Sequence, residues 1–309
     1  MLRFIGFRLI QFPLILAIIY LITFTLVWVV PGDPFERTDR KLSDEAKAAL
    51  REKYHAQSWA SFLGHYPRMV LTQGDFGWSF AYTEWTVNDI LKSALPVSVT
   101  LGLTALTIAT YAGVTIGVLA AVRRGGVIDW LSLTIALVGV SVPSFVMATL
   151  LLVGFCVQLH WFPLGWGTLR EMVLPAVSLS LMPMAYIARL TRVSMIDVLS
   201  SDYVRTARAK GLSRSSVIWK HCLRNAFLPV FSYLGPAAAA AMTGSFVVEK
   251  VFNIPGLGQH FVNSVLNRDQ TLILGTVMIY SILLMSLNLL VDVGYAFLDP
   301  RIEVGSKGD

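Results

Sequence analysis

The chain has 309 residues, of which 55% are hydrophobic and only 14% are charged, and its mean hydropathy is +0.64. This composition is typical of a polytopic membrane protein and excludes an ordinary soluble domain. The formal net charge of +6 does not indicate nucleic-acid binding, because the Lys and Arg residues cluster in short loops and at the ends of apolar runs.

The apolar run from about Leu9 to Val30 predicts a first membrane-spanning helix, so that residues 1–30 form an N-terminal tail and a span. At 1.5 Å per residue the run is long enough to cross a hydrocarbon core of about 30 Å. Arg3 and Arg8 precede it, which places the amino terminus in the cytoplasm. Because the run ends in bulky residues rather than at a small-residue cleavage site, we expect an uncleaved helix.

Residues 31–95 are polar and predict an external helical subdomain, since they contain no window of membrane-spanning length. Ser43 is expected to cap one helix, and a second helix is expected from about Gln57 to Leu71. The second helix carries an aromatic face formed by Trp59, Phe62, Leu63 and Tyr66. We expect this face to rest on the protein itself or at the lipid interface rather than to bind substrate.

Two further spans are predicted at 96–122 and 128–158, separated by a cytoplasmic turn that contains Arg123 and Arg124. The first of them is rich in Thr, Gly and Ala, the small side chains that let membrane helices approach closely. The second is interrupted by Pro143, which is expected to kink it.

The fourth span is predicted at 172–196. Arg189 and Arg192 stand near its cytoplasmic end, where we expect their long stems to snorkel to water. The fifth span, 230–248, is rich in Ala and Gly, and either close helix packing or a wide substrate space accounts for its small side chains.

The sixth span is predicted at 272–297. Its Asp292 lies near the cytoplasmic end, and we expect this carboxylate to pair with a nearby cation or backbone group rather than to couple transport to an ion. Six spans and an internal amino terminus place the carboxyl terminus in the cytoplasm as well.

The longest polar interruption of the core is the cytoplasmic loop 197–229. Its cations are Arg205, Arg208, Lys210, Arg214, Lys220 and Arg224. Residues 205–210 favour a short helix, and Gly211 is a natural C-terminal stop. By charge alone the loop is either a docking surface or a generic loop held inside by its positive charge.

The segment Tyr203–Gly211 resembles the EAA-type cytoplasmic loop of ABC-importer permeases, in its peptide-importer variant. The chain keeps the Ala and Gly of that pattern at Ala207 and Gly211, and has Arg205 and Thr206 where Glu and Ala would fall. The resemblance implies a coupling helix that sits in a groove of an ATPase subunit. The residues implied in this coupling are Tyr203, Arg205, Thr206, Ala207, Arg208, Ala209, Lys210 and Gly211.

Further motifs resemble the same peptide-permease family in the same order, namely PGDPF, GDFG, PSF, PGLGQ and DPRI. The resemblance implies an all-α type I ABC-importer transmembrane domain with six spans. It also implies that two segments contribute to a gate or pathway: Pro143, Ser144 and Phe145, and Pro255, Gly256, Leu257 and Gly258. The PGLG core is expected to be irregular rather than helical. The short aromatic loop from His160 to Trp166 favours the oligopeptide branch.

By this resemblance the protein is a multi-pass protein of the bacterial inner membrane. Its implied partners are a second homologous permease, two ABC ATPase subunits, an external substrate-binding (lipo)protein, a peptide substrate and membrane lipid. No nucleic-acid partner is expected. ATP and Mg are expected in the ATPase partners, whereas this chain is expected to bind no cofactor or metal and to be non-catalytic.

The residues themselves indicate which energy source such a carrier uses. There is no G-x-x-x-x-G-K-[ST] loop for nucleotide phosphates, and the apolar interiors lack the acidic or His relays of proton-driven carriers. The cysteines, Cys156 and Cys222, are expected at different depths and cannot pair. The alternatives are a dipeptide, nickel or other small-solute ABC importer, an ion-coupled secondary transporter, and a non-transporting receptor or scaffold.

Overall fold

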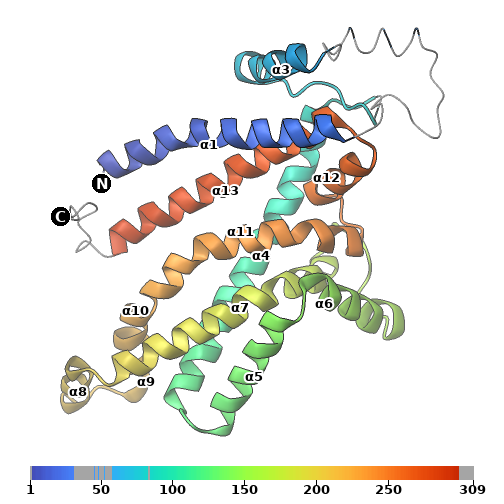
Figure 1. Ribbon diagram of the computed structural model, residues 1–309. Coiled ribbons are helices and arrows are strands. Elements are labelled where there is room, and N and C mark those ends of the chain that lie inside the picture. Colours follow the sequence, from blue (N-terminus) through green and yellow to red (C-terminus); the bar gives the residue numbers. More distant parts are fainter. Residues whose placement is uncertain are drawn as a thin grey trace. The chain divides into compact units, whose positions relative to one another are not determined.

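Figure 1 shows the computed structural model, which describes residues 2–30, 45, 48, 52, 58–82 and 84–298. Almost all of them are helical, and within this described part the only β-type pairing is the isolated bridge between Trp78 and Thr86. The helices divide into two compact units. One contains residues 2–5, residues 99–254 and the end of the last helix from Ser286, and the other contains residues 6–98 and 255–285. The predicted Ser43 cap, PGDPF at 31–35 and DPRI at 299–302 lie outside the described residues.

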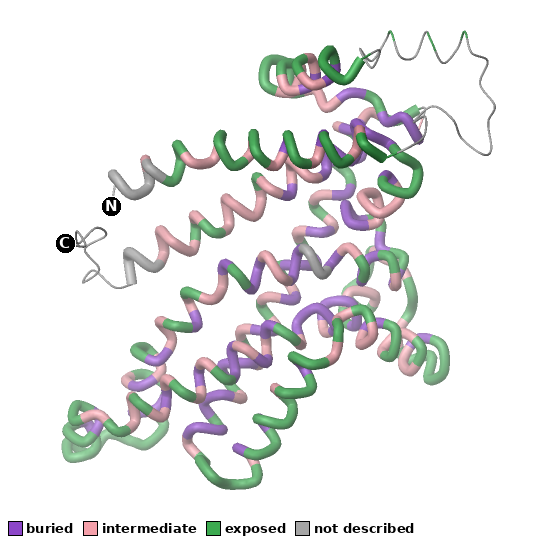
Figure 2. Tube along the Cα trace, viewed as in Figure 1, coloured by how far each residue is buried: buried purple, intermediate pink, exposed green. Residues whose placement is uncertain are grey.

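Helix α7 is the centre of the larger unit. The elements of this unit are the later part of α4 (Val87–Val122), α5 (Val127–Ser141), α6 (Ser144–Leu151), the π-helix η1 (Leu152–Gln158), α7 (Leu169–Leu199), α8 (Asp202–Ala209), α9 (Arg214–Ser216), the π-helix η2 (Val217–Cys222), α10 (Leu223–Ala226) and α11 (Leu228–Phe252). Helix α7 packs against α5, α6 and α11. Figure 2 shows buried positions along much of α7, as expected for a helix that is surrounded by others.

Close approach between α4 and α7 depends on two glycines spaced four residues apart. A Cβ added at Gly113 would lie 2.9 Å from Cβ of Ile187, and one added at Gly117 would lie 2.5 Å from the carbonyl oxygen of Ala188. No side chain fits at such distances, so only glycine permits this crossing. The prediction that the small residues of this span serve helix contact is confirmed at these two positions.

The smaller unit is held together by aromatic side chains. Its helices are α1 (Leu2–Val29), α3 (Trp59–Gln73), the start of α4, α12 (Leu257–Leu266) and the first part of α13 (Gln270–Leu298). Phe62 and Tyr66 of α3 are buried against Tyr20 and Phe24 of α1. The Tyr20 hydroxyl donates to the Leu63 carbonyl at 3.0 Å. The aromatic face of α3 therefore rests on the protein itself, as predicted, although Trp59 is 58% exposed.

The segment after α3 is fastened to the start of α13 by the fully buried Asp269. One carboxylate oxygen accepts from the hydroxyl of Ser79 and from the backbone N–H of Ala81, and the other accepts from the hydroxyl of Thr271 and the N–H of Leu272. A buried carboxylate is tolerated because donors surround it. The segment that contains GDFG thus acquires a fixed position on the smaller unit.

The predicted spans differ most from the observed helices at the second and third spans. Among the described residues, four helices are long and apolar enough to cross a membrane, and the number rises to six if each of two bent pairs is one span. The second span was expected from Pro96, but its helix begins at Val87 and contains Pro96 in its interior. The third is not one kinked helix but two, α5 and α6–η1, that meet at an angle of 104° beside Pro143.

Candidate functional site

Helix α8 forms the centre of the cationic loop. Its backbone begins after Ser201, which is extended, and it spans Asp202–Ala209. The helix therefore starts three residues before the predicted Arg205 and ends one residue before the predicted Lys210. Gly211 has φ of +76°, and its N–H donates to the carbonyl of Arg208 at 3.0 Å. This left-handed residue ends the helix, as the sequence predicted.

Two faces of α8 have opposite character. Val204 is fully buried and Ala207 is 9% exposed, whereas Tyr203, Arg205 and Arg208 are exposed. The remaining predicted coupling residues, Thr206, Ala209, Lys210 and Gly211, are exposed as well. A short helix of low hydrophobicity is stable here because its apolar face packs against the rest of the protein. The other face presents Arg205 and Arg208 to solvent.

The buried face of α8 belongs to a cluster that reaches the membrane helices. Val204 and Ala207 pack in one core with Val217, Ile218 and Cys222 of the following helical segment. The same core contains Ala226, Val230, Met195 and Ile187, together with Ala109, Val114, Val118 and Ala121 of α4. Burial raises the pKa of the Cys222 thiol, partly opposed by the charge of Arg208, so this cysteine acts as a small apolar side chain. Displacement of α8 must therefore displace α7 or disrupt a packed core.

The segment that follows α8 was predicted only as loop, but it is largely helical. Helices α9, η2 and α10 follow one another from Arg214 to Ala226 at the end of α7 (Figure 1). The side-chain amide of Asn225 donates to the hydroxyl of Tyr203 at 2.9 Å, which joins this segment to α8. The ion pair between Arg205 and Asp202, at 3.4 Å, is largely exposed to solvent and contributes little to stability.

On the coupling role that the resemblance implies, we expect Gly211→Val to lower substrate uptake by the assembled transporter, whereas Gly211→Asn leaves uptake close to that of the wild type. A Cβ at Gly211 meets no atom within 4 Å, so the effect comes from the backbone alone. The left-handed conformation costs an L-residue about 1–2 kcal/mol, and Asn tolerates it best. Vesicle uptake normalised to inserted protein measures this. Equal uptake by the Val and Asn variants would show that the end of α8 has no role in coupling.

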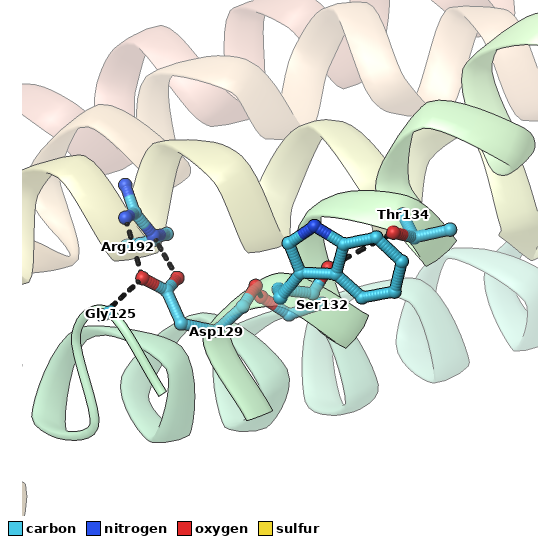
Figure 3. A network of polar contacts seen from close by, with 6 residues as sticks. Gly125, Asp129, Ser132, Thr134 and Arg192 are labelled. Carbon is cyan, nitrogen blue, oxygen red and sulfur yellow. Dashed lines mark hydrogen bonds and ion pairs between the residues drawn. The ribbon is translucent and has the colours of Figure 1, made fainter. Parts of the chain in front are cut away.

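A buried ion pair ties the start of α5 to α7 (Figure 3). Nε of Arg192 donates to Asp129 Oδ1 at 2.5 Å, and Nη2 donates to Oδ2 at 2.9 Å. The backbone N–H of Gly125 also donates to Oδ2, at 2.9 Å. The Asp129 side chain is only 5% exposed and that of Arg192 only 20%. The expectation that Arg192 snorkels to water is therefore wrong. A carboxylate on the neighbouring helix compensates its charge instead.

Sequence reasoning missed Asp129 altogether. The available signal was an acidic residue a few positions after Arg123 and Arg124, at the start of an otherwise apolar run. Such a carboxylate requires a partner, since a charge within a membrane helix is costly when unpaired. The identity of that partner was not readable, because Arg192 is 63 residues away along the chain.

The first predicted pathway segment lies at the bend between α5 and α6. Pro143 caps α6, and its carbonyl accepts from the N–H groups of Val146 and Met147 at 3.0 and 3.2 Å. Ser144 is half-buried and Phe145 is 49% exposed. The bend gives Phe145 an open position, but a role in the pathway stays a prediction.

The second predicted segment is only partly irregular, which corrects the expectation for PGLG. Gly256 is the N-cap of α12, and Leu257 and Gly258 already belong to the helix. The N–H of Leu257 donates to the hydroxyl of Ser98 on α4 at 2.8 Å, a side-chain cap that propensity alone does not show. Pro255 is exposed, whereas Gly256, Leu257 and Gly258 are buried. This segment belongs to the smaller unit and Pro143–Phe145 to the larger one.

Comparison with protein families gives a match that covers more than half of the chain. Residues 113–304 match the family described as binding-protein-dependent transport system inner membrane component. The matched region contains α8, with its buried residues Val204 and Ala207, and the Asp129–Arg192 pair.

Curated relatives match over nearly the whole length. The chain is 44% identical to the dipeptide transport system permease protein DppB of Bacillus subtilis (strain 168), and the alignment covers 95% of each chain. It is 43% identical to the oligopeptide transport system permease protein OppB of Escherichia coli (strain K12), over 98% of this chain and 99% of the relative. The OppB of Haemophilus influenzae is also 43% identical, with the same coverage.

Solved structures of lower sequence identity share the fold. An inward-facing MetNI methionine ABC transporter chain aligns with a TM-score of 0.58 at 16% identity, covering 68% of this chain and 96% of that one. A chain of an amino acid ABC transporter crystallised with histidines aligns with a TM-score of 0.52 at 18% identity, covering 67% and 94%. These likenesses show that the helices have the type I ABC-importer arrangement.

Proposed function

The chain belongs to the family of binding-protein-dependent transport system inner membrane components, and from this membership we propose that it is the permease subunit of an ATP-driven oligopeptide importer. It is an inner-membrane component with several apolar helices. Both the dipeptide and the oligopeptide permeases among its relatives are peptide carriers by name, which supports a peptide as substrate.

The observation that carries the proposal is the two-faced helix α8. Its exposed face presents Tyr203, Arg205 and Arg208, while Val204 and Ala207 lock the opposite face into the core around α7. Closure of an ATPase pair would push on the exposed face. Because the buried face cannot move alone, the push would reach α7 and switch the pathway between its outward-facing and inward-facing states.

The proposed assembly contains a second homologous permease, two ABC ATPases and an external substrate-binding protein. The family description supports the binding protein, because transport by these components depends on one. ATP and Mg²⁺ would bind in the ATPase subunits, which supply the chemistry. This chain would supply half of the pathway and the mechanical contact.

The preference for oligopeptides is supported by the short segment between η1 and α7, residues 159–168. By resemblance, dipeptide-type permeases carry a longer insertion at this place. A dipeptide importer is the second candidate, favoured by the 44% identity to the Bacillus subtilis dipeptide permease. The two candidates differ in the length of peptide that is carried.

The purified assembly in liposomes tests this proposal. We expect uptake of a labelled pentapeptide to require ATP and to continue when ionophores collapse all ion gradients, since the energy comes from the ATPases. Unlabelled pentapeptides should compete more strongly than dipeptides of the same composition. Uptake that follows an ion gradient without ATP would refute the ATP-driven importer, and stronger competition by dipeptides would assign the protein to the dipeptide branch.

A further inference from the structure

One stripe of α7 stays open although much of this helix is buried. Met182 is 42% exposed and Val193 is 51% exposed, and between them lie the half-buried Tyr186 and the exposed Arg189. Their spacing of four, three and four residues places them on one face of the helix. The other faces of α7 are covered by α4, α5, α6 and α11.

Arg189 carries a charge with no counter-ion in the described part of the protein. It takes part in no hydrogen bond or ion pair there, unlike Arg192 one turn later. It lies ten residues before the end of α7, about 15 Å along the axis. Charged residues at such positions almost always face a water-filled cavity or a partner rather than lipid tails.

The direction of the Arg189 side chain contradicts the snorkelling that we expected from sequence. A snorkelling side chain would extend toward the cytoplasmic end of α7. The guanidinium instead lies over the ring of Tyr186, at 5.2 Å from the ring centroid, one turn toward the middle of the helix. A cation–π contact holds it there.

A second helix completes the site. The ring of Tyr233, on α11, lies 5.5 Å from that of Tyr186, and the two rings are tilted by 35°. Neither phenol hydroxyl has a hydrogen-bond partner in the described part of the protein, whereas the hydroxyls of Tyr20, Tyr66 and Tyr203 all have one. One fixed cation and two phenol hydroxyls therefore share this open region of α7 and α11.

We infer that Arg189, Tyr186 and Tyr233 form a transient binding site in the transport pathway for the carboxylate of the peptide substrate. This rests on the proposed function and adds a specific ligand group to it. An arginine guanidinium binds a carboxylate through two parallel hydrogen bonds, and tyrosine hydroxyls donate to the same oxygens. The ring of Tyr186 holds the guanidinium in place without neutralising it, so the charge stays available. A carboxylate is a group common to unmodified peptides of any sequence.

The test compares a labelled peptide that has a free C-terminal carboxylate with the same peptide amidated, both loaded to saturation on the binding protein. The complete importer is reconstituted in liposomes with wild-type permease, Arg189→Gln or Arg189→Lys. We expect Arg189→Gln to lower the ratio of acid to amide uptake about tenfold, because charge-assisted hydrogen bonds are lost. Arg189→Lys keeps the charge and should retain most of the ratio. Arg170→Gln, at the other end of α7, is the matched control and should leave the ratio unchanged.

Several outcomes would overturn the inference. An equal loss of acid and amide uptake in Arg189→Gln would give the arginine a structural role. A loss that depends on the anionic lipid content of the liposomes, with an unchanged ratio, would assign it to a lipid headgroup. If Arg189→Gln fails to assemble, Tyr233→Phe decides the matter through the same ratio, which should fall severalfold. Wild-type liposomes that take up neither peptide would instead refute the proposed function.

Discussion

Replacing Arg205 and Arg208 together with Glu is expected to abolish peptide uptake and peptide-stimulated ATP hydrolysis, while the protein remains inserted and folded. Both side chains lie on the exposed face of α8, and neither contributes to the core that holds this helix. Reversing their charge therefore leaves the fold intact. It would, however, place carboxylates against the ATPase surface that we expect to attract the two arginines. The measurements are uptake and ATPase activity of the assembly in liposomes.

A matched variant separates α8 from the general charge of the loop. Lys220→Glu combined with Arg224→Glu changes the net charge by the same amount, and both residues are exposed in the same loop. Topology depends on Lys and Arg near the spans, so both double variants alter that signal equally. We expect the control to retain most of its uptake. Equal loss in both variants, or unchanged uptake in the α8 variant, would contradict docking through α8.

Removing either partner of the Asp129–Arg192 pair is expected to destabilise the protein by about 3–5 kcal/mol, because the remaining charge is left buried and unpaired. Asp129→Leu and Arg192→Met are the single variants. The two replacements together remove both charges, and we expect the double variant to be closer to the wild type than either single one. We therefore expect strong coupling between the two replacements in a double-mutant cycle.

Thermal unfolding in detergent measures this cycle through the native cysteines. Cys156 and Cys222 are both buried and free, so a thiol-reactive dye reports their exposure as the protein unfolds. The single variants should unfold at clearly lower temperatures than the double variant. Exchange of the charges, Asp129→Arg with Arg192→Asp, should recover less than the double replacement, since the Gly125 N–H then faces a cation. Additive effects of the two single variants would show that the pair contributes nothing.

Packing decided several features that the sequence left open. The alanine-rich α11 admitted either tight packing or a wide space, and in the structure Ala237, Ala238 and Ala241 are buried. A Cβ at Gly235 would lie 2.5 Å from Oδ1 of Asn288 on α13, so this part of α11 is closely packed. For Asp292 the structure shows an interaction, and the choice between pairing and ion coupling stays a prediction.

The sequence by itself determined the membrane class, the family and the place of the cationic loop. These follow from local properties, namely apolar runs of spanning length, clustered Lys and Arg, and a helix that ends at Gly211. Only the tertiary structure decided that Val204 and Ala207 anchor α8, that Arg192 pairs with Asp129, and that Arg189 turns toward Tyr186. Each of these depends on which side chains a fold brings together or leaves apart. Hydrophobicity and propensity describe each segment alone, so they carry no information about such partners.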